Sequence, residues 1–139
     1  MAANQEDVER AKAAASSCDD VMLDRLLLTT DRIRAMAHDI ETVIALPDPV
    51  GEMIDERTRP NGLTIQRVRV PLGVVGMIYE SRPNVTVDAA VLCLKSGNAV
   101  MLKGGSDAIS TNRVLVTIMK EALEDSKAGI LSDALQFID

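Results

Sequence analysis

The spacing of apolar residues predicts helices in the first part of the chain. Apolar side chains recur every three or four residues in three stretches, as on helices with one buried face. The stretches carry Val8, Ala11 and Ala15; Met22, Leu23, Leu26 and Leu27; and Ile33, Met36, Ile40 and Ile44. A polar run at 16–20 separates the first two, and Pro47 and Pro49 end the third. We therefore expect three helices, the first starting near Asn4 and the third at Thr30.

The pattern changes after a connector at 48–62 that is rich in Asp, Pro, Gly and Arg. Residues 63–70 alternate apolar and polar side chains, which predicts a half-buried strand. Short apolar runs follow at 73–79, 99–102 and 134–138, and the first of them is typical of a strand covered on both faces.

Helical segments are expected at 85–95 and 108–123, between the apolar runs. The resulting order, β-α-β-α-β with right-handed crossovers, predicts an α/β fold with a doubly wound parallel sheet. Such sheets bind ligands at the carboxyl ends of their strands. We therefore expect the ligand site at the loops that leave those ends, at 80–84 and 103–107.

The loop that follows the strand at 99–102 combines a cation, two glycines and a hydroxyl, in Lys103, Gly104, Gly105 and Ser106. Glycines allow a close backbone approach, and the free N–H groups of the next helix favour an anion. These residues would suit a phosphate or ribose hydroxyls. The pattern lacks the usual dinucleotide and P-loop fingerprints, so a tight turn in which Ser106 caps the helix remains an alternative.

The loop at 80–84 offers two further polar groups. The Asn84 amide could donate to an oxyanion, and Arg82 could pair with a carboxylate or phosphate. In the alternative interpretation, Asn84 caps the helix that begins at Val85.

Composition narrows the function classes. The chain has 139 residues, a net charge of −6 and 1% aromatic residues, which argues against duplex nucleic acid and base-stacking modules. Cys18 and Cys93 stand far apart and His38 is the only histidine, so no metal site is expected. Cys93 lies in an apolar helical segment and is interpreted as a core residue. No signal peptide or apolar run long enough for a membrane span is visible.

A longer stretch carries a family resemblance. Residues 70–113 read VPLGVVGMIYESRPNVTVDAAVLCLKSGNAVMLKGGSDAISTNR, and they resemble the signature region of gamma-glutamyl phosphate reductases, also called glutamate-5-semialdehyde dehydrogenases. The similarity extends to MLDRLLLTTDRIRAMAHDI, to LPDPVGEMIDERTRPNGLTIQRVRVPLG and to ALQFID.

The resemblance implies an aldehyde-dehydrogenase-like fold with three parts. These are an N-terminal helical region at 1–50, a connector and strand of the oligomerisation part at 51–71, and a partial Rossmann-like NADP-binding domain at 72–139. It also implies NADPH-dependent reduction of gamma-glutamyl phosphate to glutamate 5-semialdehyde in proline biosynthesis. A cytoplasmic homo-oligomer is expected, with functional coupling to glutamate 5-kinase.

Residue roles follow from the same resemblance. Asn84 would donate to the carbonyl oxygen of the substrate. Arg82 and Ser81 would bind substrate, and the cofactor would meet Ile78, Tyr79, Glu80, Lys103, Gly104, Gly105 and Ser106. The nucleophilic cysteine of the family has no counterpart in this chain, which we therefore interpret as a fragment that is inactive alone. A noncatalytic nucleotide-binding module and a helical interaction protein remain alternatives. An unfinished sheet would also expose strand edges and favour self-association.

Overall fold

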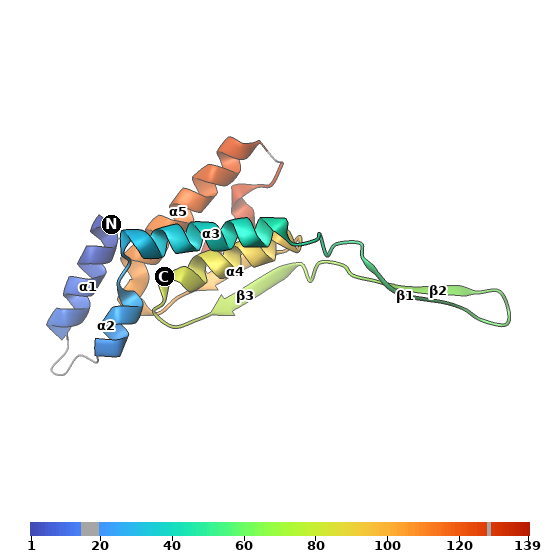
Figure 1. Cartoon of the computed structure of the whole chain (residues 1–139), viewed down its shortest axis with the longest axis horizontal. Coiled ribbons are helices and arrows are strands. Elements are labelled where there is room, and N and C mark those ends of the chain that lie inside the picture. Colours follow the sequence, from blue (N-terminus) through green and yellow to red (C-terminus); the bar gives the residue numbers. More distant parts are fainter. Residues whose placement is uncertain (15–19, 128) are drawn as a thin grey trace.

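The computed structural model describes residues 1–14, 20–127 and 129–139. It has a body of helices packed on a parallel sheet, from which a long β-hairpin projects (Figure 1). Within the described residues, no helix combines the length and apolar character needed to traverse a bilayer.

The three helices expected at the start of the chain are present. They are α1 (Ala2–Ala14), α2 (Asp20–Leu26) and α3 (Thr30–Ala45). The Thr29 hydroxyl accepts the Arg32 N–H at 3.2 Å and so caps α3. The expected break at 16–20 lies outside the described residues, except that Asp20 already begins α2.

The segment at 48–70 differs from expectation. Part of the predicted connector forms β1 (Met53–Thr58), which pairs antiparallel with β2 (Thr64–Val68). The turn between them uses Gly62 at φ +86°, a conformation that favours glycine. The strand predicted at 63–70 is confirmed as β2. Its predicted half-burial is wrong, because every residue of β1 and β2 except Ile65 is exposed.

The parallel sheet is confirmed. Its strands are β3 (Val74–Ile78), β4 (Ala99–Lys103) and β5 (Leu135–Phe137), in that spatial order. The crossovers contain α4 (Pro83–Lys95) and α5 (Ile109–Ser126). Short 3₁₀ turns, η1 (Ser106–Ala108) and η2 (Ser132–Ala134), precede α5 and β5.

The core lies on one face of this sheet. Ala90 of α4 and Val100, Leu102 and Leu135 of the strands have no exposed surface, and they pack with residues of α5. α3 packs on α4, and α1 packs on α5, as an outer layer (Figure 1). Two smaller apolar clusters fill these contacts.

The opposite face of the sheet is open among the described residues. Val74 is 66% exposed, Ile78 86% and Met101 41%. The expectation of a β3 strand covered on both faces is therefore wrong for this chain. The strand order does not reverse, and successive right-handed crossovers in one direction place both helices on the same face.

Candidate functional site

The loops that leave β3 and β4 lie against each other at the carboxyl edge of the sheet. The Tyr79 N–H donates to the Lys103 carbonyl at 3.0 Å, which extends the strand pairing into the loops. A Cβ on Gly105 would collide with the Ser81 hydroxyl and stand 3.0 Å from the Ser81 nitrogen. The Ser81 hydroxyl donates to Asp107 at 3.1 Å. Gly105 therefore serves the packing of one loop on the other.

Tyr79 and Gly104 face the interior. A Cβ on Gly104 would lie 3.2 Å from the Tyr79 ring and would also collide with the Asn112 amide. The Tyr79 hydroxyl is 2.7 Å from the Thr86 hydroxyl, which donates to Asn112 Oδ1 at 2.8 Å. Burial raises the pKa of Tyr79, although the bond with Thr86 acts in the other direction. This chain of polar groups joins the residue after β3 to α4 and α5, where Thr86 and Asn112 are fully buried, and the local sequence pattern gave no sign of it.

Lys103 and Ile78 face the open side of the sheet. They are direct register partners, and both alternate with residues that point into the core. The Lys103 side chain makes no hydrogen bond or ion pair with any residue that the structure describes. Ser106 is exposed at the start of η1. Lys103, Ile78 and Ser106 thus form an accessible rim at the ends of β3 and β4.

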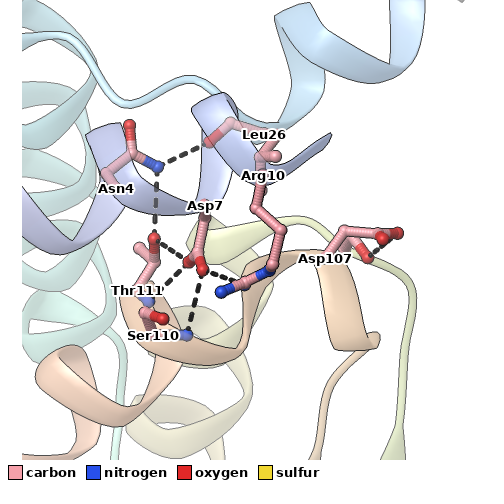
Figure 2. Close-up of polar contacts among 8 residues, drawn as sticks. Asn4, Asp7, Arg10, Leu26, Asp107, Ser110 and Thr111 are labelled. Carbon is pink, nitrogen blue, oxygen red and sulfur yellow. Dashed lines mark hydrogen bonds and ion pairs between the residues drawn. The ribbon is translucent and has the colours of Figure 1, made fainter. Parts of the chain in front are cut away.

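The start of α5 is occupied by a carboxylate from α1 (Figure 2). Asp7 has no exposed surface and accepts the N–H groups of Ser110 at 3.2 Å and Thr111 at 2.7 Å. It also accepts the Thr111 hydroxyl at 2.6 Å and pairs with Arg10. Burial raises the pKa of Asp7, but the hydrogen bonds from Thr111 and Ser110 outweigh it, and the net pKa is lowered.

The expectation of free N–H groups at the start of this helix is therefore wrong for Ser110 and Thr111. A carboxylate of the protein already binds those of Ser110 and Thr111. Ser106 does not cap α5 through its side chain either. Asn4 extends the same network, because its amide donates to Thr111 and to the Leu26 carbonyl (Figure 2). The Asn4 side-chain oxygen accepts the Leu28 N–H. No local sequence motif predicts the contact between Asp7 and Thr111, which are 104 positions apart.

Asn84 lies in the first turn of α4. The cap position is Arg82, so the interpretation of Asn84 as the cap is wrong. Asn84 is exposed, and its amide donates to Asp88 Oδ2 at 3.4 Å, a long contact. Burial and the charge of Asp39 raise the pKa of Asp88, and the Asn84 amide opposes that rise.

Two pockets adjoin this part of the chain. The first, of about 290 Å³, is called the loop pocket and is lined by Met22, Arg25, Glu80, Ser81, Arg82, Gly105 and Asp107. The second, of about 470 Å³, is called the helix pocket and lies among α2, α3 and the start of α4. The helix pocket is lined by Asp24, Arg25, Leu27, Leu28, Arg32, Ala35, Met36, Asp39, Arg82 and Asn84. The structure thus adds Arg25 and Asp39 to the polar groups near Asn84.

Cys93 lies in the core, as the sequence predicted. Cys93 is buried among the core residues of α4, and burial raises the pKa of its thiol, which makes it a poor nucleophile. His38 is exposed on α3 beside Glu41. Cys18 lies outside the described residues. Among the residues that are described, no three His, Cys, Asp or Glu side chains gather as a metal site would require.

A parallel β-α-β-α-β unit with its polar groups at the carboxyl edge defines a Rossmann-like α/β protein. No family model matches the sequence. Gamma-glutamyl phosphate reductase of Halalkalibacterium halodurans is 57% identical over 136 residues, and that of Zymomonas mobilis is 53% identical over 138. These matches cover 98% and 99% of the chain, and 32% and 31% of the relatives.

Solved structures of the same family are similar to this chain. The crystal structure of a gamma-glutamyl phosphate reductase from Thermotoga maritima has a TM-score of 0.91 and 48% sequence identity. The match covers 99% of this chain and 32% of the Thermotoga chain. The crystal structure of the reductase from Saccharomyces cerevisiae has a TM-score of 0.87 and 37% sequence identity. That match covers 98% of this chain and 35% of the yeast chain. The chain is therefore homologous to gamma-glutamyl phosphate reductases, and it spans about a third of the length of the curated relatives it matches.

Proposed function

We propose that this chain is part of an enzyme that reduces gamma-glutamyl phosphate to glutamate 5-semialdehyde with NADPH, in proline biosynthesis. The observation that carries the proposal is the 57% identity to a named reductase along nearly the whole chain. Within that enzyme, residues 72–139 would form part of the cofactor-binding domain, and residues 1–50 would form the helical region that covers it.

The rim at the ends of β3 and β4 fits a phosphorylated nucleotide. Lys103 has a cation without a partner among the described residues, Ser106 offers an exposed hydroxyl, and Ile78 offers an apolar surface. These groups would hold the ribose and phosphate of NADPH on the open side of the sheet. Gly104 and Gly105 keep the two loops close enough for that rim to exist. When bound, NADPH would supply the hydride for the reduction.

Asn84 is the group of this chain that would act on the substrate. Its exposed amide would donate to the acyl oxygen, where negative charge develops when a nucleophile attacks. The long contact with Asp88 leaves the amide loosely held and available. The family's mechanism needs a reactive thiol, and Cys93 does not fit because it is buried with a raised pKa.

The proposal includes a cytoplasmic homo-oligomer. The hairpin in 51–71 exposes Met53, Ile54, Leu63 and Val68, which would pack against another copy of the protein. Coupling with glutamate 5-kinase also belongs to the proposal, because an acyl phosphate hydrolyses readily in water and direct transfer would protect it.

NADPH titration of the 139-residue chain, followed by NADPH fluorescence, tests the cofactor assignment. We expect saturable binding that Lys103→Gln weakens by roughly tenfold, since one charge-assisted contact with a phosphate is lost. Lys12→Gln is the matched control, because Lys12 is exposed in the last turn of α1 and lines neither the loop pocket nor the helix pocket. Failure to bind NADPH, or equal binding by the two variants, would contradict the assignment.

A further inference from the structure

Arg25 and Arg82 stand between the loop pocket and the helix pocket, because both side chains line both pockets. They come from α2 and from the loop after β3. Among the described residues, Glu80 has the only carboxylate within 4.0 Å of either guanidinium, with Oε2 at 3.9 Å from Arg25 Nη1 and 3.7 Å from Arg82 Nε. Both distances exceed a hydrogen bond.

Glu80 is therefore a weak partner for two cations. Its side chain is 76% exposed, so water screens the carboxylate and weakens its ion pairs with both arginines. Arg82 Nε is shielded from solvent and has no hydrogen-bond acceptor among the described residues. An incoming carboxylate could accept from these guanidinium groups directly and displace Glu80 toward solvent.

The helix pocket also contains an anion without a partner. The Asp39 side chain, on α3, makes no hydrogen bond or ion pair with any residue that the structure describes. Burial and, after it, the charge of Asp39 raise the pKa of Asp88, which means that the two carboxylates repel each other. A bound cation would relieve that repulsion.

The other two charges in the helix pocket neutralise each other. Arg32 donates to Asp24 Oδ1 at 2.8 Å and to the Leu27 carbonyl at 2.8 Å, and so holds the turn between α2 and α3. Apart from the Arg32–Asp24 pair, the charged residues of the pocket are the cations Arg25 and Arg82 and the anion Asp39. Leu28 and Met36 form apolar walls.

We propose that Arg25 and Asp39 bind the α-carboxylate and α-ammonium groups of the substrate's amino-acid end in the helix pocket. Arg82 assists at the carboxylate, and Leu28 and Met36 contact the methylene chain. The assignment rests on the proposed function, because that substrate is an α-amino acid activated at its far end. The complementarity to both signs of charge favours a zwitterion over a bare phosphate. Asn84, on the same pocket wall, would then lie where the activated end of a bound glutamyl chain can reach.

The test is an NMR titration of the ¹⁵N-labelled 139-residue chain with L-glutamate at constant ionic strength. We expect amide shifts confined to α2, the 80–84 loop and the middle of α3. Arg25→Gln should weaken L-glutamate binding roughly tenfold, and Arg25→Lys should weaken it less. Asp39→Asn should weaken binding of L-glutamate but not of glutarate, which has no ammonium group.

The matched control is Arg34→Gln. Arg34 lies on the same helix as Asp39, is 74% exposed, pairs with Asp31 and lines neither pocket. Unchanged L-glutamate affinity in Arg25→Gln with a native amide spectrum, or no shifts in the wild-type chain, overturns the inference. NADPH binding is measured on the same samples. If NADPH binds and L-glutamate does not, the amino-acid subsite alone is refuted, whereas the absence of NADPH binding counts against the proposed function.

Discussion

Replacement of Asp7 by alanine leaves three donors at the start of α5 without an acceptor. They are the N–H groups of Ser110 and Thr111 and the Thr111 hydroxyl, and Arg10 loses its partner as well. A buried donor that loses its acceptor costs about 1–3 kcal/mol. Arg10 is 45% exposed, so water can solvate its charge and its loss of a partner adds little. The costs of the three donors overlap because they share one acceptor, so we expect a loss of about 3–5 kcal/mol of unfolding free energy.

The size of this loss makes it easy to measure. Domains of this kind have unfolding free energies of about 5–15 kcal/mol, so the loss is a large fraction of the total. Divided by the m-value that is typical of small proteins in urea, the loss lowers the urea midpoint by about 2 M. Far-ultraviolet circular dichroism is the suitable probe, because the chain has one Tyr and no Trp. Glu9→Ala on the exposed side of α1 is the control and should change stability by less than about 0.5 kcal/mol.

The effect should also depend on pH. The pKa of Asp7 is lowered in the folded state, so its contribution is complete above the ordinary aspartate value of 3.8 and disappears as the pH falls through the lowered value. The stability difference between wild type and Asp7→Asn should therefore shrink in acid. A difference below about 0.5 kcal/mol at neutral pH, or one that grows in acid, would refute the role assigned to Asp7.

Three further outcomes are expected. Gly105→Ala should lower the unfolding free energy by about 1–3 kcal/mol and weaken NADPH binding, because the new methyl group collides with Ser81. Gly76→Ala is the control and should change stability little, because no atom lies within 4 Å of the added methyl group. Equal urea midpoints of the two variants would contradict this prediction. The raised pKa of Tyr79 means that the unfolding free energy should fall as the pH rises above the ordinary value of 10.0, and Tyr79→Phe should lack this decline in alkaline urea titrations. Removal of the hairpin at 53–68 should reduce the assembly size in sedimentation, and a wild-type chain that stays monomeric at high concentration would count against the oligomer contact.

Local patterns determined the regular elements of the body. Helical spacing located α1, α2 and α3, and short apolar runs located β3, β4 and β5, because burial of one face or one run dictates which positions are apolar. The order of strands and helices also determined the parallel sheet, since the handedness of crossovers leaves few alternatives. The family resemblance followed from the loop residues between these elements, and the comparisons confirm it.

Contacts between distant segments decided the rest. β1 was missed because its sequence, MIDERT, has no alternation, and it is a strand through its pairing with β2. Periodicity reports that a residue is apolar but not which neighbour covers it, so β3 appeared covered on both faces although one face is open. The Asp7–Thr111 contact and the presence of Arg25 and Asp39 in one pocket depend on how helices pack. The energies of such contacts depend on three-dimensional distance, which separation along the chain does not encode.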